Sequence, residues 1–220
     1  VCACAGIIIG ITALTGVGLK VSAILIDLGG VSILLSLFLA MIISLILGMG
    51  LPTTAAYIIC AAIVAPSLIK LGLNPLASHL FVFYFSCISE ITPPVGVAYY
   101  VAAGIARANP TKVGLTACRL GLAAFIVPYM FVFGPSLLLK GELYMILWTI
   151  ISAIIGVIAL ASGVERWFMG RPTSWLQTGL LLAAALLLIK PGLTTDLIGF
   201  GLLGIVFILW SFGKRKGSLN

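Results

Sequence analysis

The stretch GMGLPTT at residues 48–54 separates two apolar runs, residues 31–47 and 55–69. A second stretch, SEITPPVG at residues 89–96, divides the apolar segment 77–106. Helices that face lipid do not unwind, because an unpaired backbone amide or carbonyl is costly in a bilayer. Broken backbone at membrane depth survives where it is buried in protein or lines a wet cavity. Paired interruptions of this kind are typical of the ion or substrate site of a secondary transporter, so the two breaks predict part of a carrier.

The composition is that of a membrane protein. Of the 220 residues, 62% are hydrophobic and 8% are charged, whereas about 25% are charged in a soluble domain. Apolar stretches of about 17–22 residues recur, the length that crosses a hydrocarbon core of about 30 Å. The net charge of +7 is spread over short loops and the tail KRK at 214–216, which does not suggest nucleic-acid binding. We therefore expect an all-α integral membrane protein, built as a multi-helix bundle.

The first break combines backbone freedom with oxygen atoms. Gly48 and Gly50 permit backbone angles that other residues resist, and Pro52 removes a donor and frees a carbonyl. Thr53 and Thr54 add hydroxyl oxygens, and oxygens of both kinds suit a small hard cation. The break also offers donors to a substrate carboxylate, because the next helix begins there with its positive dipole end. The alternative is a tight turn of a helical hairpin without a site.

The second break follows the same logic. Pro93 and Pro94 cannot donate, so carbonyls near Ser89 and Glu90 lose their helical partners. Glu90 is the main candidate for a functional residue in this break, because ionisable side chains at membrane depth are usually functional. The alternative for Glu90 is a structural carboxylate, bonded to backbone amides or protonated in a protein pocket.

Together the breaks define one predicted site. The predicted substrate ligands are the side chains of Thr53, Thr54, Glu90 and Thr92. The predicted sodium ligands, mainly backbone carbonyls, belong to Gly48, Gly50, Pro52, Ile91, Thr92 and Pro94. We expect non-helical backbone at residues 50–53 and 92–95, and we expect the two breaks to approach each other.

Two other classes of function are alternatives. An intramembrane enzyme would need a nucleophile–base pair or a metal cluster at depth. The chain has one histidine, His79, and five cysteines without metal-ligand spacing. We therefore predict no enzyme, no catalytic residue and no cofactor apart from sodium as coupling ion. A non-transporting membrane scaffold would have no use for the broken helices.

The positions of lysine and arginine predict an orientation. The tail at 214–216, the loop 163–173 and the turn 107–112 fall on one side, which the positive-inside rule makes cytoplasmic. Residues 20–30 form a neutral loop in this scheme. The rule leaves open whether residues 31–69 span twice or dip in and return as a re-entrant hairpin. We expect a multi-pass protein with a cytoplasmic C-terminus.

Strings around both breaks resemble the large, DctM-like membrane subunit of the tripartite ATP-independent periplasmic (TRAP) transporters. They are LGMGLPTTAAYI at residues 47–58, HLFVFYF at 79–85 and ITPPV at 91–95, in the same order. The resemblance covers roughly residues 1–140. Residues 113–140 are most similar to the fused form, in which small and large membrane subunits share one chain.

The resemblance implies a bacterial inner-membrane symporter that uses a sodium gradient and moves as an elevator. Its implied substrate is an organic acid delivered by a periplasmic solute-binding protein. The small membrane subunit, or its fused equivalent upstream, is the other implied partner. By analogy, residues 1–140 are the second-repeat region, with a re-entrant hairpin at 31–69 and a proline-broken helix at 77–106. Residues 141–220 would be a C-terminal transmembrane extension.

Only one pair of broken segments is present, so we expect one half of an inverted-repeat carrier. Val1 lies inside an apolar run and is not a methionine, so we also expect a longer parent protein. Expressed alone, residues 1–220 should then insert into a membrane without transporting. On this expectation, polar groups in 48–54 and 89–95 should lack partners, because their neighbours lie upstream.

Overall fold

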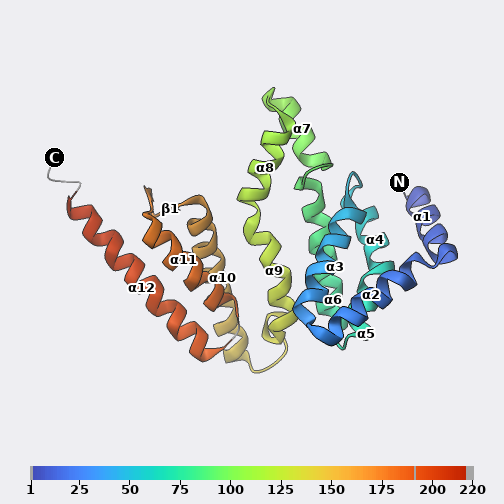
Figure 1. The fold of residues 1–220 in the computed structure, drawn as a ribbon. Coiled ribbons are helices and arrows are strands. Elements are labelled where there is room, and N and C mark those ends of the chain that lie inside the picture. Colours follow the sequence, from blue (N-terminus) through green and yellow to red (C-terminus); the bar gives the residue numbers. More distant parts are fainter. Residues whose placement is uncertain (1, 191, 217–220) are drawn as a thin grey trace. The chain divides into compact units, whose positions relative to one another are not determined.

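The computed structural model describes residues 2–190 and 192–216, and these are almost entirely helical (Figure 1). The elements of the N-terminal part are α1 (Cys2–Thr15), α2 (Val17–Val31), α3 (Ile33–Gly48), α4 (Thr53–Ile63), α5 (Ala65–Lys70), α6 (Pro75–Ile88), the 3₁₀ turn η1 (Ser89–Ile91), α7 (Val97–Ala106), α8 (Pro110–Leu120) and α9 (Leu122–Phe133). The elements that follow are the 3₁₀ turn η2 (Pro135–Leu138), α10 (Leu143–Glu165), β1 (Trp167–Phe168), β2 (Arg171–Pro172), α11 (Trp175–Ile189) and α12 (Leu193–Lys216). The predicted all-α fold is confirmed.

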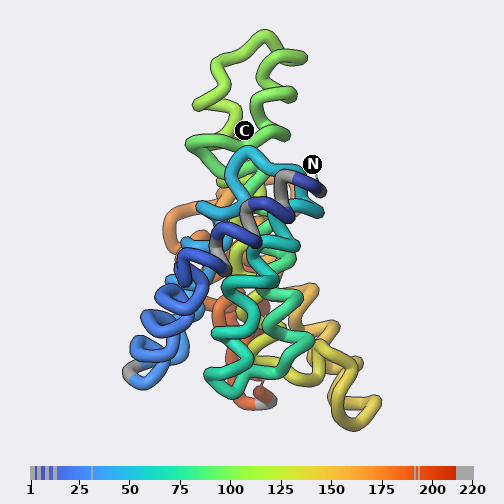
Figure 2. Tube along the Cα trace, turned by 90° about the vertical axis from the view of Figure 1, so that its right-hand side faces the viewer, coloured from blue at the N-terminus to red at the C-terminus, as the bar shows by residue number. Residues whose placement is uncertain are grey.

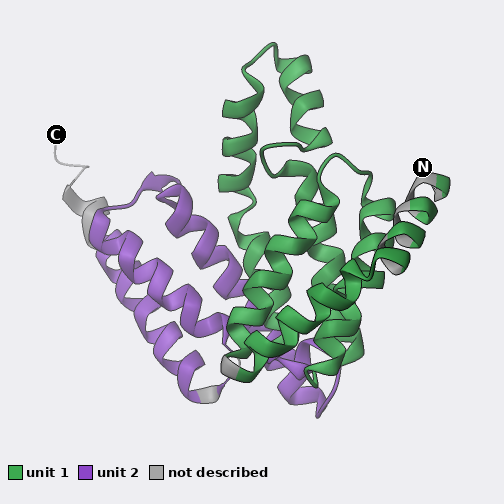
Figure 3. Cartoon of the chain, turned by 45° about the vertical axis from the view of Figure 1, so that its right-hand side comes forward, with its two compact units in different colours: residues 1–132 green, residues 133–220 purple. Residues whose placement is uncertain are grey.

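The chain divides into two compact units, coloured separately in Figure 3. Unit 1 comprises residues 1–132 and unit 2 comprises residues 133–220. The predicted domain boundary after residue 140 stays a prediction.

The core of unit 1 lies among α3, α4 and α6, which run side by side in Figures 1 and 2. Leu37, Ile59 and Phe81 come from these three helices, and none of them is more than 1% exposed. The Phe81 ring also meets that of Tyr129 from α9 edge to face, with 5.3 Å between the ring centroids. Since aromatic rings bury large apolar areas, this core fixes the helices that carry both breaks. Helices α7 and α8 pack on each other and project from that core.

In unit 2, α10 packs on α11 and α11 packs on α12. Small residues allow these close approaches. A Cβ atom added to Gly199 of α12 would lie 2.7 Å from the Cγ atom of Leu188 on α11, closer than carbon atoms pack.

Among the described residues, three helical stretches are long and apolar enough to cross a membrane: Thr53–Lys70, Leu143–Glu165 and Thr194–Ser211. A fourth candidate is the pair α8 and α9, which is bent by 42° at Gly121. Many large apolar side chains point outward, which suits helices solvated by lipid. The fold is therefore that of an all-α membrane protein.

Two predicted details are wrong. Residues 20–30 are not a loop but lie in α2, because Lys20 and Asp27 both reach the surface from the helix. The expected loop 163–173 begins later, since α10 continues to Glu165, and it holds the short antiparallel pair β1–β2.

Candidate functional site

The first break is a four-residue turn between α3 and α4. Helix α3 ends at Gly48 and α4 begins at Thr53, so the predicted non-helical stretch is confirmed except at Thr53 itself. Pro52 precedes α4 in an extended conformation and has no amide hydrogen to leave unpaired. Gly50 has φ +71°, a left-handed conformation that glycine adopts without steric cost.

The second break interrupts a helix with a turn flanked by extended residues, Thr92 and Gly96. Helix α6 tightens into η1, the chain is then non-helical from Thr92 to Gly96, and α7 begins at Val97. The prolines at 93 and 94 explain the interruption, because neither can donate a helical hydrogen bond. The predicted break at 92–95 is confirmed.

The two breaks contact each other, as predicted. The backbone N–H of Gly50 donates to the carbonyl of Val95 across 3.2 Å. The backbone N–H of Thr53 donates to Oε1 of Glu90 across 2.7 Å, and the Thr53 hydroxyl donates to the same oxygen. A Cβ atom at Gly48 would clash with the side chain of Ser89, so only glycine allows this approach of α3 to η1. Residues far apart in sequence thus form one local structure.

Glu90 caps the beginning of α4. Its half-buried carboxylate lies at the first amide of that helix, where the helix dipole favours a negative charge. Hydrogen bonds to an ionised acceptor are about twice as strong as neutral ones. The donors that were predicted to meet a substrate carboxylate therefore meet a carboxylate of the chain itself.

The remaining predicted substrate ligands are placed differently. The Thr54 side chain is exposed and does not take part in the contact between Thr53 and Glu90. The Thr92 hydroxyl donates to the carbonyl of Ile88 across 2.8 Å, which leaves its lone pairs available as acceptors. The structure thus joins two of the four predicted substrate residues directly.

Several of the predicted sodium-ligand carbonyls each accept one hydrogen bond. The donors are the Leu51 N–H to Gly48 (3.2 Å), the Ala56 N–H to Pro52 (3.1 Å), the Cys118 thiol to Ile91 (3.5 Å) and the Tyr99 hydroxyl to Pro94 (2.6 Å). A carbonyl oxygen has two lone pairs, so each of them can still ligate a cation. The described residues contain no group of three His, Cys, Asp or Glu side chains that could hold a metal ion. The sodium assignment stays a prediction.

The expectation that polar groups at the breaks would lack partners is wrong. Thr53 and Glu90 bind each other, Thr92 binds Ile88, and the Ser89 hydroxyl donates to the carbonyl of Ser86 across 2.7 Å. Thr53 and Glu90 come together because α3, α4 and α6 share one core, whereas Ser89 and Thr92 donate to carbonyls of α6 itself.

Sequence reasoning missed two buried polar groups. Ser44 of α3 is fully buried, and its hydroxyl has no hydrogen-bond partner among the described residues. Asp196 in the first turn of α12 is only 2% exposed. Its burial depends on contacts with α10, which no local pattern reveals. The one available sign was a lone carboxylate directly before an apolar run.

Comparison with known proteins gives two matches. The model of the family described as "Tripartite ATP-independent periplasmic transporter, DctM component" matches residues 1–146. The "Isethionate TRAP transporter permease protein DctMQ" of Oleidesulfovibrio alaskensis is 33% identical over 89 residues, which are 39% of this chain and 14% of that protein. The match thus spans about a seventh of that relative's length. No solved structure matches.

Proposed function

Since this chain belongs to the DctM family of TRAP transporter permeases, we propose that it forms part of a sodium-coupled carrier for an organic acid. The family is one of transporter permeases, not of enzymes. The related protein is named for isethionate, and we extend its class of small anionic substrate, not its identity, to this chain.

One observation carries the proposal: the two breaks meet. The hydrogen bonds from Gly50 to Val95 and from Thr53 to Glu90 join the end of α3, the beginning of α4 and the interruption after α6. Irregular backbone, a helix N-terminus and an ionisable side chain thus lie together. This is the combination from which secondary transporters build their ion and substrate sites.

In the proposed mechanism, sodium binds the carbonyl oxygens of the two breaks with help from the hydroxyls of Thr54 and Thr92. The substrate acid binds beside it, where the dipole of α4 favours negative charge. Glu90 holds that position in the structure, so the substrate competes with Glu90 for the amide of Thr53. Sodium offsets the extra negative charge, which would make substrate binding depend on the ion.

The remaining parts of the proposal concern the whole protein. A periplasmic solute-binding protein would deliver the acid, and a small membrane subunit or its fused equivalent would support the carrier. Residues 31–69 would form a re-entrant hairpin within a region, residues 1–140, that moves as an elevator in the bacterial inner membrane. Residues 141–220 would be a transmembrane extension.

Reconstitution tests this function. The whole permease is placed in liposomes with its purified binding protein, and uptake of labelled organic acids, isethionate among them, is measured. We expect uptake only with an inward sodium gradient and only with the binding protein present. Equal uptake when potassium replaces sodium would contradict sodium coupling, and equal uptake without the binding protein would contradict delivery by that partner.

A further inference from the structure

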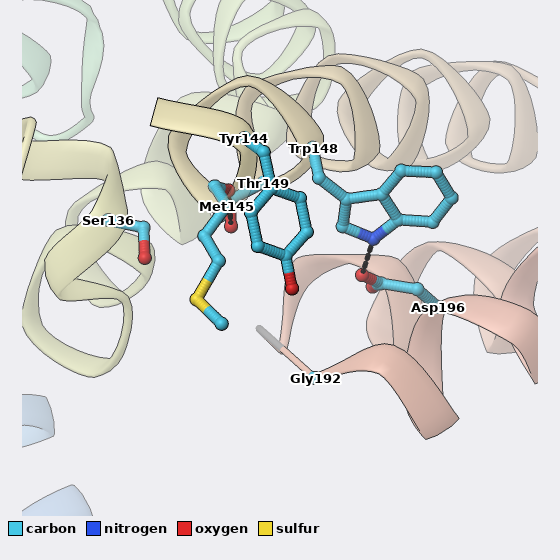
Figure 4. A pocket seen from close by; sticks show the side chains of 7 residues that line it. All are labelled: Ser136, Tyr144, Met145, Trp148, Thr149, Gly192 and Asp196. Atoms are coloured by element: carbon cyan, nitrogen blue, oxygen red, sulfur yellow. Dashed lines mark hydrogen bonds between the residues drawn. The ribbon is translucent and has the colours of Figure 1, made fainter. Parts of the chain in front are cut away.

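Unit 2 contains a cavity of about 250 Å³ that none of the proposed transport steps uses. It lies where α10 begins, next to η2 and the first turn of α12 (Figure 4). Tyr144, Met145 and Trp148 supply an aromatic and thioether lining from α10, and Asp196 of α12 supplies a carboxylate. Ser136 and Thr149 add hydroxyl groups, so the lining is mostly apolar and Asp196 is its one acidic group.

The carboxylate of Asp196 is buried among neutral donors. The Trp148 Nε1–H donates to Oδ2 across 2.8 Å, and the Ser152 hydroxyl donates to Oδ1 across 2.8 Å. No lysine, arginine or histidine in the described part of the chain forms an ion pair with Asp196. An ionised carboxylate that is 2% exposed is costly unless a cation accompanies it. Each of its oxygens has a second lone-pair site free, so the cavity can accept a cationic partner.

We propose that this cavity binds a primary ammonium group, carried by a lipid headgroup or by a free amine. Asp196 provides the counter-charge and hydrogen-bond acceptor, and the rings of Tyr144 and Trp148 provide π faces that attract organic cations. Trp148 serves twice, because its N–H also orients the carboxylate. The site is separate from the breaks of unit 1, and the proposal does not depend on sodium-coupled transport.

Other ligand classes fit the lining less well. A hard metal ion needs several oxygen ligands and favours carboxylates, whereas this lining offers one carboxylate beside neutral hydroxyl groups, aromatic rings and a thioether. An anion would be repelled by Asp196. A neutral apolar molecule would leave the buried carboxylate without a counter-charge.

Binding measurements on the whole permease in detergent test the proposal. Free ethanolamine is titrated by calorimetry, and short-chain phosphatidylethanolamine is scored against phosphatidylglycerol by native mass spectrometry. We expect Asp196→Asn to weaken amine binding at least about tenfold. The exposed Asp27 provides a matched control, and Asp27→Asn should bind as the unmodified protein does. Binding of the lipid but not of ethanolamine assigns a headgroup, and the opposite result assigns a free amine.

A second variant tests the proposal if Asp196→Asn does not fold. Tyr144 is 56% exposed, and its side chain forms no hydrogen bond with another described residue. Tyr144→Leu should therefore fold normally and bind the amine several-fold more weakly. The proposal is overturned if the unmodified permease binds neither amine. It is also overturned if both folded variants bind the amines as tightly as the control.

Discussion

The carboxylate of Glu90 occupies the beginning of α4, the position at which a substrate carboxylate was expected. It accepts hydrogen bonds from both the amide and the hydroxyl of Thr53. At the scale of single residues, Glu90 therefore combines both interpretations that the sequence left open: it is bonded to a backbone amide, and it lies in the candidate site. If a substrate acid displaces this link, as we propose, its binding would be coupled to movement of the turn before α4.

Replacing Glu90 by glutamine should loosen this link. A hydrogen bond to a charged group contributes about 1.5–3 kcal/mol to stability, more than a hydrogen bond between neutral groups. In Glu90→Gln the bond to Thr53 should therefore be weaker, and the turn before α4 should open more often. We expect a cysteine placed at Met49, in a permease whose native cysteines are replaced by alanine, to react with a thiol reagent about tenfold faster. The exposed Glu142 supplies the control Glu142→Gln. An unchanged rate in Glu90→Gln would show that the carboxylate does not hold the turn.

At the scale of the elements, glycines decide how closely the broken helices approach. The Cβ position of Gly48 is taken by the side chain of Ser89, and the Cβ position of Gly96 is taken by the backbone of Glu90. Both glycines lie at the ends of helices that meet in the candidate site. The close packing of α3, η1 and α7 therefore requires glycine at positions 48 and 96.

Adding one methyl group at this junction should destabilise unit 1. Gly48→Ala forces Ser89 or α3 to move, and overpacking of this kind costs about 1–3 kcal/mol. The thermal unfolding midpoint of the purified permease should fall measurably. Gly104 of α7 has no atom within 4 Å of its Cβ position, so Gly104→Ala should leave the midpoint unchanged or raise it. Equal midpoints for both variants would mean that α3 and η1 are not held at this distance.

The sequence predicts where the helices break but not which residues the breaks bring together. Local chemistry located both breaks, because glycine at 50 and proline at 52, 93 and 94 act on their own backbone. The bond between Thr53 and Glu90 joins residues 37 positions apart, and it depends on how three helices pack. The burial of Asp196 by α10 has the same origin. Residues 20–30 were predicted as a loop because Lys20 and Asp27 lower the local hydropathy, although both are exposed positions of helix α2.

At the scale of the whole molecule, the chain combines the family region with further helices in unit 2. The family match ends at residue 146, within the first turns of α10. Unit 2 contains the cavity beside Asp196 as a candidate site. The two units therefore differ in the chemistry that they offer.

The orientation of the chain can be tested on the turn between β1 and β2. Met169 in this turn is 61% exposed, and the positive-inside rule places it in the cytoplasm together with Arg166 and Arg171. In intact cells, a Met169→Cys variant without other cysteines should not react with a membrane-impermeant thiol reagent, and it should react after the cells are opened. Labelling of intact cells would reverse the proposed topology.

The sodium dependence of uptake tests most directly whether the two breaks form one sodium-coupled site. In the reconstituted whole permease, Thr54→Val and Thr92→Val each remove one hydroxyl oxygen and should raise the half-saturating sodium concentration several-fold to about tenfold, equivalent to about 1.4 kcal/mol at the upper end. Thr116→Val is the matched control, since the exposed Thr116 hydroxyl on α8 also donates to the carbonyl four residues earlier, and its sodium dependence should not change. Unchanged sodium activation in both break variants, with full insertion of the protein, would contradict the claim.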